Sequence, residues 1–225
     1  MSFTIIDVCH TIHHGMITYK GLPPPVISDH LSREDSRKSY EDGTEFHIGK
    51  IEMVANTGTY LDSPFHRYPD GNDLSQLDLA TLAELDGVVA RFTGKQERAI
   101  TSADLRVALN VADLNGKAVL VETGWSRHWR TDQYFEGHPF LAEDAAEMLV
   151  AAGAALVGID SLNIDDIDDG RRPVHSTLLA ANVLIVEHMT GLQTLPLTGF
   201  RFSAVPVKVK EMGTFPVRAY ASLPG

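Results

Sequence analysis

The sequence predicts a mixed α/β protein in which short strands outnumber helices. Strand-like apolar or alternating runs recur along the chain, with only three or four helical patterns between them. No internal repeat or low-complexity linker divides the 225 residues, so a single domain, residues 1–225, is expected, with ample length for a core. Because strands and helices do not alternate regularly, a repeated βαβ architecture is not expected.

The individual elements follow from hydrophobic periodicity in chain order. Strands are expected at residues 3–8, 47–55, 85–92, 118–122, 155–159, 183–187, 200–209 and 217–223. Helices are expected at residues 102–110 with Ser102 as the cap, at 141–152 with Gly153 following the end, and at 176–182. Residues 28–44 are polar and charged, which fits a solvated loop, a mobile flap or an arm that reaches a second subunit.

Composition limits the classes of partner and compartment. The net charge of −11 disfavours a nucleic-acid or anionic-membrane partner. The one cysteine, Cys9, excludes an internal disulfide, and the first residues lack a basic, apolar leader, so a cytoplasmic location is expected. No stretch approaches the roughly 20 apolar residues that a membrane span requires.

Residues 56–66 carry the strongest functional signal. In an extended segment the even-numbered positions share one face, which would present Tyr60, Asp62 and His66, while the odd positions from Ile51 to Leu61 would face the core. Pro64 argues against a central strand beyond that point, so Asp62 and His66 are expected where a strand gives way to a loop. The alternative is an ordinary half-buried strand with a polar outer face.

This stretch resembles the signature H-x-G-T-H-x-D-x-P-x-H of the cyclase-like metal hydrolases, the family of bacterial kynurenine formamidase and isatin hydrolase. Five signature positions match: Gly58, Thr59, Asp62, Pro64 and His66. Asn56 and Tyr60 stand where the signature has its two leading histidines. The resemblance implies a swivelling β/β/α fold, with a barrel-like, mostly antiparallel sheet and flanking helices.

A second segment extends the resemblance over nearly the whole chain. Residues 157–161 match the family's G-[IV]-D-S segment, and His175 and Glu187, twelve residues apart, match a His and a Glu that ligate metal in the family. A buried Glu after an apolar run is unfavourable unless it is paired or ligating. The alternative is a Glu187 that ends a strand in solvent and a His175 that only begins a helix.

The resemblance also implies how metals would be held. In the family, one metal is bound by two histidines and the aspartate, and a second by the same aspartate, a His and a Glu. The second set is present as Asp62, His175 and Glu187 and could hold one Zn²⁺ or Mn²⁺. The first set is reduced to Asp62, because an amide and a phenol with a pKa of about 10 are weak zinc ligands, so the second family metal is expected to be lost.

The remaining site residues receive roles by the same comparison. His66 matches the family's acid/base histidine, and Tyr60 could donate to an oxyanion or only fill the space of the missing metal. Asn56 and Trp125 are candidate substrate contacts, although core packing explains Trp125 and Trp129 equally well. The acidic run at residues 165–169 lacks EF-hand spacing and is expected to be a solvated loop beside the site.

Three functional hypotheses follow. The first is a metal-assisted hydrolase of a C–N bond other than a peptide bond, arylformamidase-like, acting on an N-formylkynurenine-type or cyclic amide or a lactone. The second is a metal-free lyase or isomerase of a small carboxylate that uses His66 and Tyr60. The third is a non-catalytic binding protein, which the joint retention of Asp62, His66, His175 and Glu187 disfavours. The resemblance further implies a homodimer or homotetramer.

Overall fold

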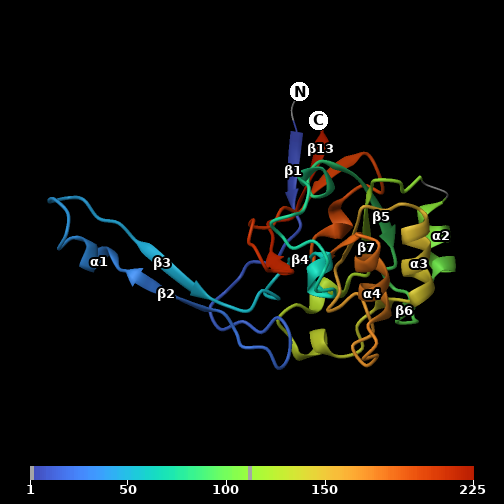
Figure 1. The fold of residues 1–225 in the computed structure, drawn as a ribbon, viewed down its shortest axis with the longest axis horizontal. Coiled ribbons are helices and arrows are strands. Elements are labelled where there is room, and N and C mark those ends of the chain that lie inside the picture. The colour runs from blue at the N-terminus through green and yellow to red at the C-terminus, as the bar shows by residue number, and fades with distance from the viewer. Residues whose placement is uncertain (1–2, 111–112) are drawn as a thin grey trace.

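A computed structural model describes residues 3–110 and 113–225 of the chain (Figure 1). Within these residues a curled nine-stranded sheet has the order β1-β13-β11-β5-β7-β9-β10-β4-β12. Its strands are β1 (Phe3–Asp7), β4 (Tyr60–Asp62), β5 (Leu85–Arg91), β7 (Ala118–Glu122), β9 (Leu156–Ile159), β10 (Leu184–Glu187), β11 (Phe200–Ser203), β12 (Thr214–Pro216) and β13 (Tyr220–Pro224). The neighbours β5, β7, β9 and β10 run parallel, and every other pair in this sheet is antiparallel. The predicted mixed class, with a mostly antiparallel, barrel-like sheet, is confirmed.

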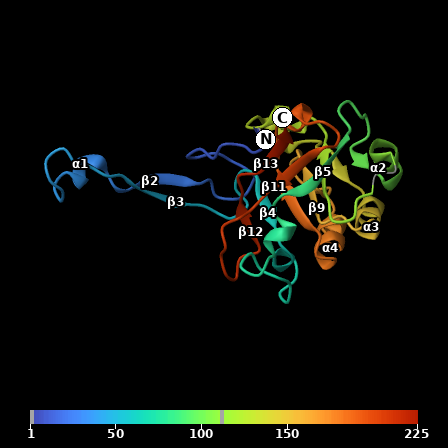
Figure 2. The same cartoon turned by 90° about the horizontal axis from the view of Figure 1, so that it is seen from above.

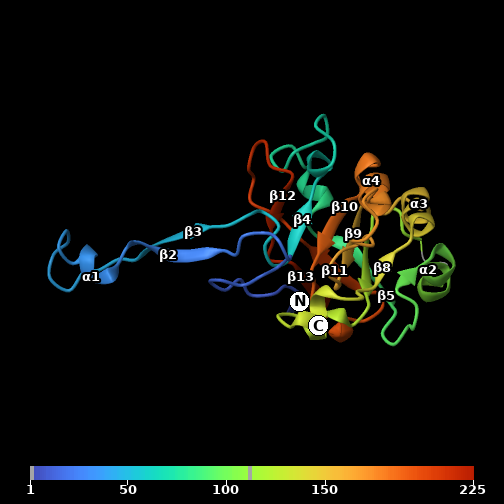
Figure 3. The same ribbon diagram turned by 90° about the horizontal axis from the view of Figure 1, so that it is seen from below.

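Three helices cover one face of the parallel centre of the sheet (Figure 3). They are α2 (Ser102–Leu109), α3 (Glu143–Ala151) and α4 (Pro173–Ala180). Alternation along β7 separates two apolar cores, because Val119 and Val121 pack under the helices while Leu120 packs in the core on the opposite face. No helix of the described residues is long and apolar enough to cross a membrane.

Short elements complete the body of the molecule. The two-residue strands β6 (Ala99–Ile100) and β8 (Phe140–Leu141) pair in parallel. Single 3₁₀ turns are η1 (Pro64–His66), η2 (Leu79–Thr81), η3 (Trp125–His128), η4 (Asp132–Phe135) and η5 (Leu192–Thr194).

An arm, residues 26–52, stands away from this body in all three views (Figures 1–3). It consists of β2 (Val26–Leu31), the one-turn helix α1 (Arg33–Ser36) and β3 (Ile48–Glu52), and β2 pairs only with β3 among the described strands. The segment predicted as a loop, flap or arm is therefore the outer part of a two-stranded ribbon.

The structure corrects three local predictions. Ile51 was expected in the core but is half exposed on the arm, and the chain between the arm and β4 is not extended, because Gly58 has a φ of +69°. Helix α2 is capped by Thr101, not Ser102, through a reciprocal capping box with Asp104. Helix α4 begins three residues earlier than predicted because Pro173 occupies its first turn, where proline is favoured.

Candidate active site

Strands β4 and β10 place three polar side chains on one face of the sheet. Leu61 enters the core opposite the helices, so alternation turns Tyr60 and Asp62 toward the α4 side. In the antiparallel register Tyr60 lies opposite Glu187, the last residue of β10. Glu187 is almost fully buried, which excludes the alternative in which it simply ends a strand in solvent.

Helix α4 brings His175 to the same place, and Asp165 fixes its orientation. The buried carboxylate of Asp165 accepts hydrogen bonds from the backbone N–H groups of Val174 and His175 at 2.7 and 3.0 Å, so it caps the first turn of the helix. It also accepts from Nδ1 of His175 at 2.6 Å. This contact keeps the proton on Nδ1 and leaves Nε2 to face Asp62 and Glu187.

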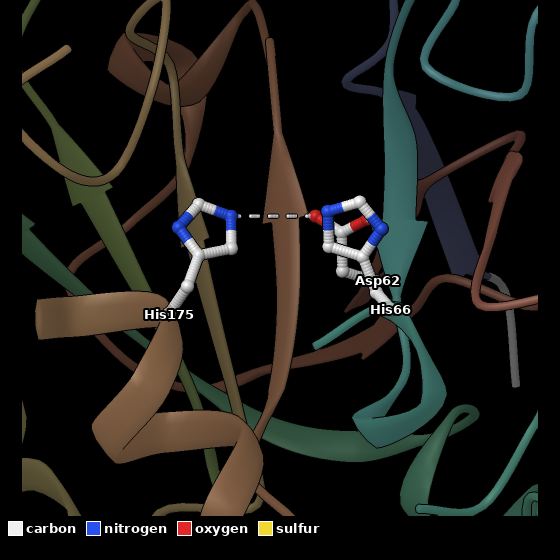
Figure 4. A group of neighbouring side chains, drawn as sticks. All are labelled: Asp62, His66 and His175. Carbon is white, nitrogen blue, oxygen red and sulfur yellow. Dashed lines mark ion pairs between the residues drawn. The ribbon is translucent and has the colours of Figure 1, made fainter. Parts of the chain in front are cut away.

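Two carboxylate oxygens lie near His175 Nε2 without a hydrogen bond to it. His175 Nε2 lies 3.7 Å from Asp62 Oδ2 and 3.8 Å from Glu187 Oε1, and Figure 4 shows His175 facing Asp62 and His66 from the opposite side. Both separations are too long for hydrogen bonds. They approach the spacing of about 3.4 Å expected for two donors of a tetrahedral zinc ion. Asp62 Oδ2 is buried and has no hydrogen-bond partner within residues 3–110 and 113–225.

His66 is connected to Asp62 through the hydroxyl of Thr214. Thr214 donates to Asp62 Oδ1, so its oxygen accepts from Nδ1 of His66, 2.8 Å away. The neighbouring Gly213 permits this approach, because a Cβ there would lie 2.4 Å from the backbone nitrogen of His66. His66 Nε2 is thereby left with its lone pair, as a proton acceptor requires.

The buried groups carry more negative than positive charge. Burial alone would lower the pKa of His175, but the carboxylates of Glu187, Asp165 and Asp62 raise it to about 10. Burial, together with the charge of Asp62, raises the pKa of Glu187. Burial opposes ionisation of Asp62, yet its contacts with His175 and Thr214 and the nearby imidazoles hold its pKa below the usual value. Carboxylates crowded around one imidazole in a buried site favour a bound cation.

The Asn56–Tyr60 side of the site is different. The Tyr60 hydroxyl donates to Glu187 Oε2 at 2.7 Å. Complete burial, then the charges of Glu187 and Asp62, raise the pKa of Tyr60 well above that of a free phenol. A protonated phenol that is already engaged as a donor is a poor metal ligand, so this side does not offer the donor set of a second metal.

The donor set therefore fits one divalent ion. Asp62, His66 and His175 each bring one ligand atom into a group that spans less than 4.8 Å. Among the described residues Glu187 is not a member of this group, although its Oε1 lies 3.8 Å from His175 Nε2. The hydrogen bond from His66 to Thr214 favours His66 as a proton carrier. Asp62, His175 and Glu187 thus remain the predicted metal ligands, and the identity of the ion stays a prediction.

A cavity of about 490 Å³ opens onto these groups. Its lining is Tyr19, Lys20, Gly21, Leu22, Asn56, Tyr60, His66, Arg67, Asn163, Arg172, His175 and Glu187. Trp125 lies elsewhere, since it lines a separate cavity of about 180 Å³ and its indole N–H donates to the Tyr134 carbonyl. The structure thus brings Asn56 to the site and gives no support to substrate contact by Trp125.

Sequence reasoning missed two residues that shape the site. Asp165 was assigned to a solvated loop, yet it is fully buried against His175. Thr214 lies in β12, a strand that was not predicted. A run of aspartates hides which one is buried, and a threonine 152 residues from Asp62 has no local pattern that reveals its partner.

Comparison with known proteins agrees with this architecture. A family model described as putative cyclase matches residues 6–166, which is more than half of the chain. The chain belongs to the cyclase family. The resemblance read from residues 56–66 and 157–187 is therefore confirmed, although this cyclase departs from the signature at Asn56 and Tyr60.

Proteins similar to this chain include ones named as hydrolases. The chain is 27% identical over 219 residues to the kynurenine formamidase of Bacillus cereus, with 95% of each chain covered. A potential metal-dependent hydrolase with cyclase activity has a TM-score of 0.80 at 25% identity and full coverage of both chains. An isatin hydrolase bound to thioisatinate has a TM-score of 0.84 at 21% identity, covering 99% of this chain and 93% of the other, which supports the fold.

Proposed function

We propose that this cyclase is a metal-assisted hydrolase of an amide or lactone bond, arylformamidase-like in its chemistry. The observation that carries the proposal is that His175 Nε2 lies 3.7 Å from Asp62 Oδ2 and 3.8 Å from Glu187 Oε1 without a hydrogen bond to either, while Asp62 Oδ2 has no partner among the described residues. They lie beside a cavity that is also lined by His66. The names of the relatives, kynurenine formamidase and isatin hydrolase, support the same reaction class.

In this proposal Asp62, His175 and Glu187 hold one Zn²⁺ or Mn²⁺ ion. Such an ion polarises a carbonyl and lowers the pKa of water, which is the chemistry that amide hydrolysis needs. Asp165 keeps the Nδ1 proton on His175 and so holds the Nε2 lone pair in position.

His66 is the proposed acid/base residue. Its Nδ1–H is anchored on Thr214, which in turn donates to Asp62, so the ring orientation is fixed. Nε2 takes a proton from the attacking water and returns it to the leaving amine. Tyr60 orients Glu187 through its hydrogen bond, and a direct role for Tyr60 toward an oxyanion would require that bond to break.

The substrate class is a small aryl formamide or a cyclic amide of the N-formylkynurenine type. The test is hydrolysis of formanilide by protein freed of metal with a chelator and then reloaded with Zn²⁺ or Mn²⁺. We expect activity only after reloading. Activity that survives complete removal of metal would favour the metal-free lyase or isomerase, and no turnover of any formamide or cyclic amide would favour a binding protein.

We also propose that the protein is a homodimer or homotetramer whose subunits contact through the arm. Apolar side chains of the arm are 44% to 52% exposed: Val26, Ile27, Tyr40, Phe46, Ile48 and Ile51. A two-stranded ribbon is only marginally stable by itself, and clustered exposed apolar groups are typical of an interface. Light scattering at micromolar concentration is expected to give a multiple of the 24.6 kDa chain, and a monomer would contradict the proposal.

Two further expectations belong with this function. We propose that residues 1–225 act as one domain and that the protein works in the cytoplasm, where its single cysteine would remain reduced. Limited proteolysis and cell fractionation test them.

A further inference from the structure

Three cationic side chains line the cavity of a strongly acidic protein. Lys20, Arg67 and Arg172 all lie on its wall, although the chain has a net charge of −11. They come from separate parts of the chain, namely the loop before the arm, the residue after η1 and the residue that precedes helix α4. Local sequence does not cluster them, so the fold gathers this charge at the cavity.

The two guanidinium groups are held in place but are not neutralised. Arg67 Nε donates to Ser176 Oγ at 3.2 Å, and Arg172 Nη1 donates to the carbonyl of Asp166 at 2.7 Å. Across residues 3–110 and 113–225, neither group forms an ion pair, whereas the adjacent Arg171 pairs with Asp169 at 2.8 Å. The remaining N–H groups of Arg67 and Arg172 can therefore donate to an external anion.

Arg172 precedes helix α4 in a left-handed backbone conformation. Its φ of +50° costs free energy for a residue with a side chain. Six other non-glycine residues among those described also have a positive φ, so the binding role of Arg172 rests on its place in the cavity lining and not on this conformation.

The buried carboxylates do not account for these cations. The pKa of Asp62 reflects its burial, then His175, His66 and Thr214, and that of Glu187 reflects burial, then His175 and Asp62. Glu187 also accepts from Tyr60 and from the backbone of Ile164. The charges of Asp62 and Glu187 are therefore compensated by other residues of the site, not by Arg67 or Arg172.

We propose that Arg67 and Arg172 form an anion subsite that selects substrates carrying a carboxylate away from the scissile bond. Lys20 already lies 4.0 Å from Glu136, so the subsite does not depend on it. A planar carboxylate matches the fork of a guanidinium, and the charge-assisted hydrogen bonds are stronger than neutral ones. That the bound anion is a substrate rests on the hydrolase function proposed above, whereas binding of the anion does not require turnover.

The first test measures binding without catalysis. Metal-free protein is titrated calorimetrically with para-formamidobenzoate and with its neutral isostere para-formamidobenzamide. The carboxylate should bind more tightly to the unaltered protein. Arg172→Gln and Arg67→Gln should each weaken its binding by about tenfold or more and leave the amide unchanged, because each removes a charge-assisted contact. The matched control is Arg171→Gln, which removes the neighbouring charge outside the cavity and should change neither affinity.

The second test uses the metal-loaded enzyme. For para-formamidobenzoate both cavity variants should raise KM with little change in kcat, since the contact binds ground state and transition state alike. Equal binding of the two probes by the unaltered protein would overturn the proposal, and so would a carboxylate preference that survives in both variants. Absence of turnover with either probe counts against the hydrolase function, whereas the calorimetry alone decides the subsite.

Discussion

The Asp62–His175 side of the cavity and the Asn56–Tyr60 side differ in whether their polar atoms already have partners. On the first side, His175 Nε2 and Asp62 Oδ2 face each other at 3.7 Å, and Asp62 Oδ2 has no hydrogen bond from any described residue. On the second side, the Tyr60 hydroxyl is bonded to Glu187 at 2.7 Å. One side is arranged to receive a cation, and the other is complete without one.

This difference explains how a buried site can lose two imidazoles and remain ordered. A neutral phenol with a raised pKa satisfies one carboxylate oxygen of Glu187 without adding charge. The other oxygen accepts from Ile164 N and still lies 3.8 Å from His175 Nε2. The family fold is therefore kept, while the unpartnered carboxylate oxygen lies on one side only.

The largest loss of activity is expected for His66→Ala. Loss of acid/base assistance should lower kcat by about 10²–10⁴-fold. Metal content, measured by elemental analysis, should be unchanged, because Asp62, His175 and Glu187 remain. His30→Ala, which removes an exposed imidazole on the arm, is the control. Loss of metal in His66→Ala would show that His66 is a ligand instead.

Asp165→Asn should cause the next largest loss, in metal affinity or activity. The amide cannot accept the Nδ1 proton of His175 as a carboxylate does, so metal affinity or activity should fall by about 10–100-fold. Competition with a chromogenic chelator measures the affinity. Asp169→Asn alters an acid of the same loop that pairs with Arg171 and should leave affinity unchanged. An equal loss in both variants would mean that loop charge, not His175 orientation, matters.

Tyr60→Phe tests the opposite side. Removing the phenol leaves a buried carboxylate oxygen short of a donor and should lower the free energy of unfolding by about 1–3 kcal/mol. Metal stoichiometry should not change. Tyr40→Phe on the exposed arm should stay within about 0.5 kcal/mol in the same denaturant titration. A loss of metal from Tyr60→Phe would contradict the division between the two sides.

The double change Asn56→His and Tyr60→His is expected to give the smallest of these effects, a second metal site that is weaker than the first. Two imidazoles next to Asp62 would supply a His-rich donor set that tolerates zinc. We expect a second, weaker metal site by calorimetric titration, with the first site retained. No second binding event would indicate that the surrounding side chains no longer admit the ion.

Sequence patterns predicted the elements whose signal is local. The strand at residues 118–122 and the approximate limits of α2 and α3 follow from the hydrophobic period, and Glu187 ends a strand that was expected. Asp165 could not be separated from the three other aspartates of residues 165–169, because burial depends on how α4 docks. Ile51 was misplaced since an exposed apolar ribbon has the same alternation as a core strand.

Metal stoichiometry tests the central claim most directly. Protein purified without a histidine tag or chelator should contain one divalent ion per chain by inductively coupled plasma mass spectrometry, with formanilide hydrolysis proportional to its occupancy. Two fully occupied ions per chain would contradict the account, because the Asn56–Tyr60 side would then bind metal despite its hydrogen bond to Glu187. Full activity in a sample shown to be free of metal would contradict it equally.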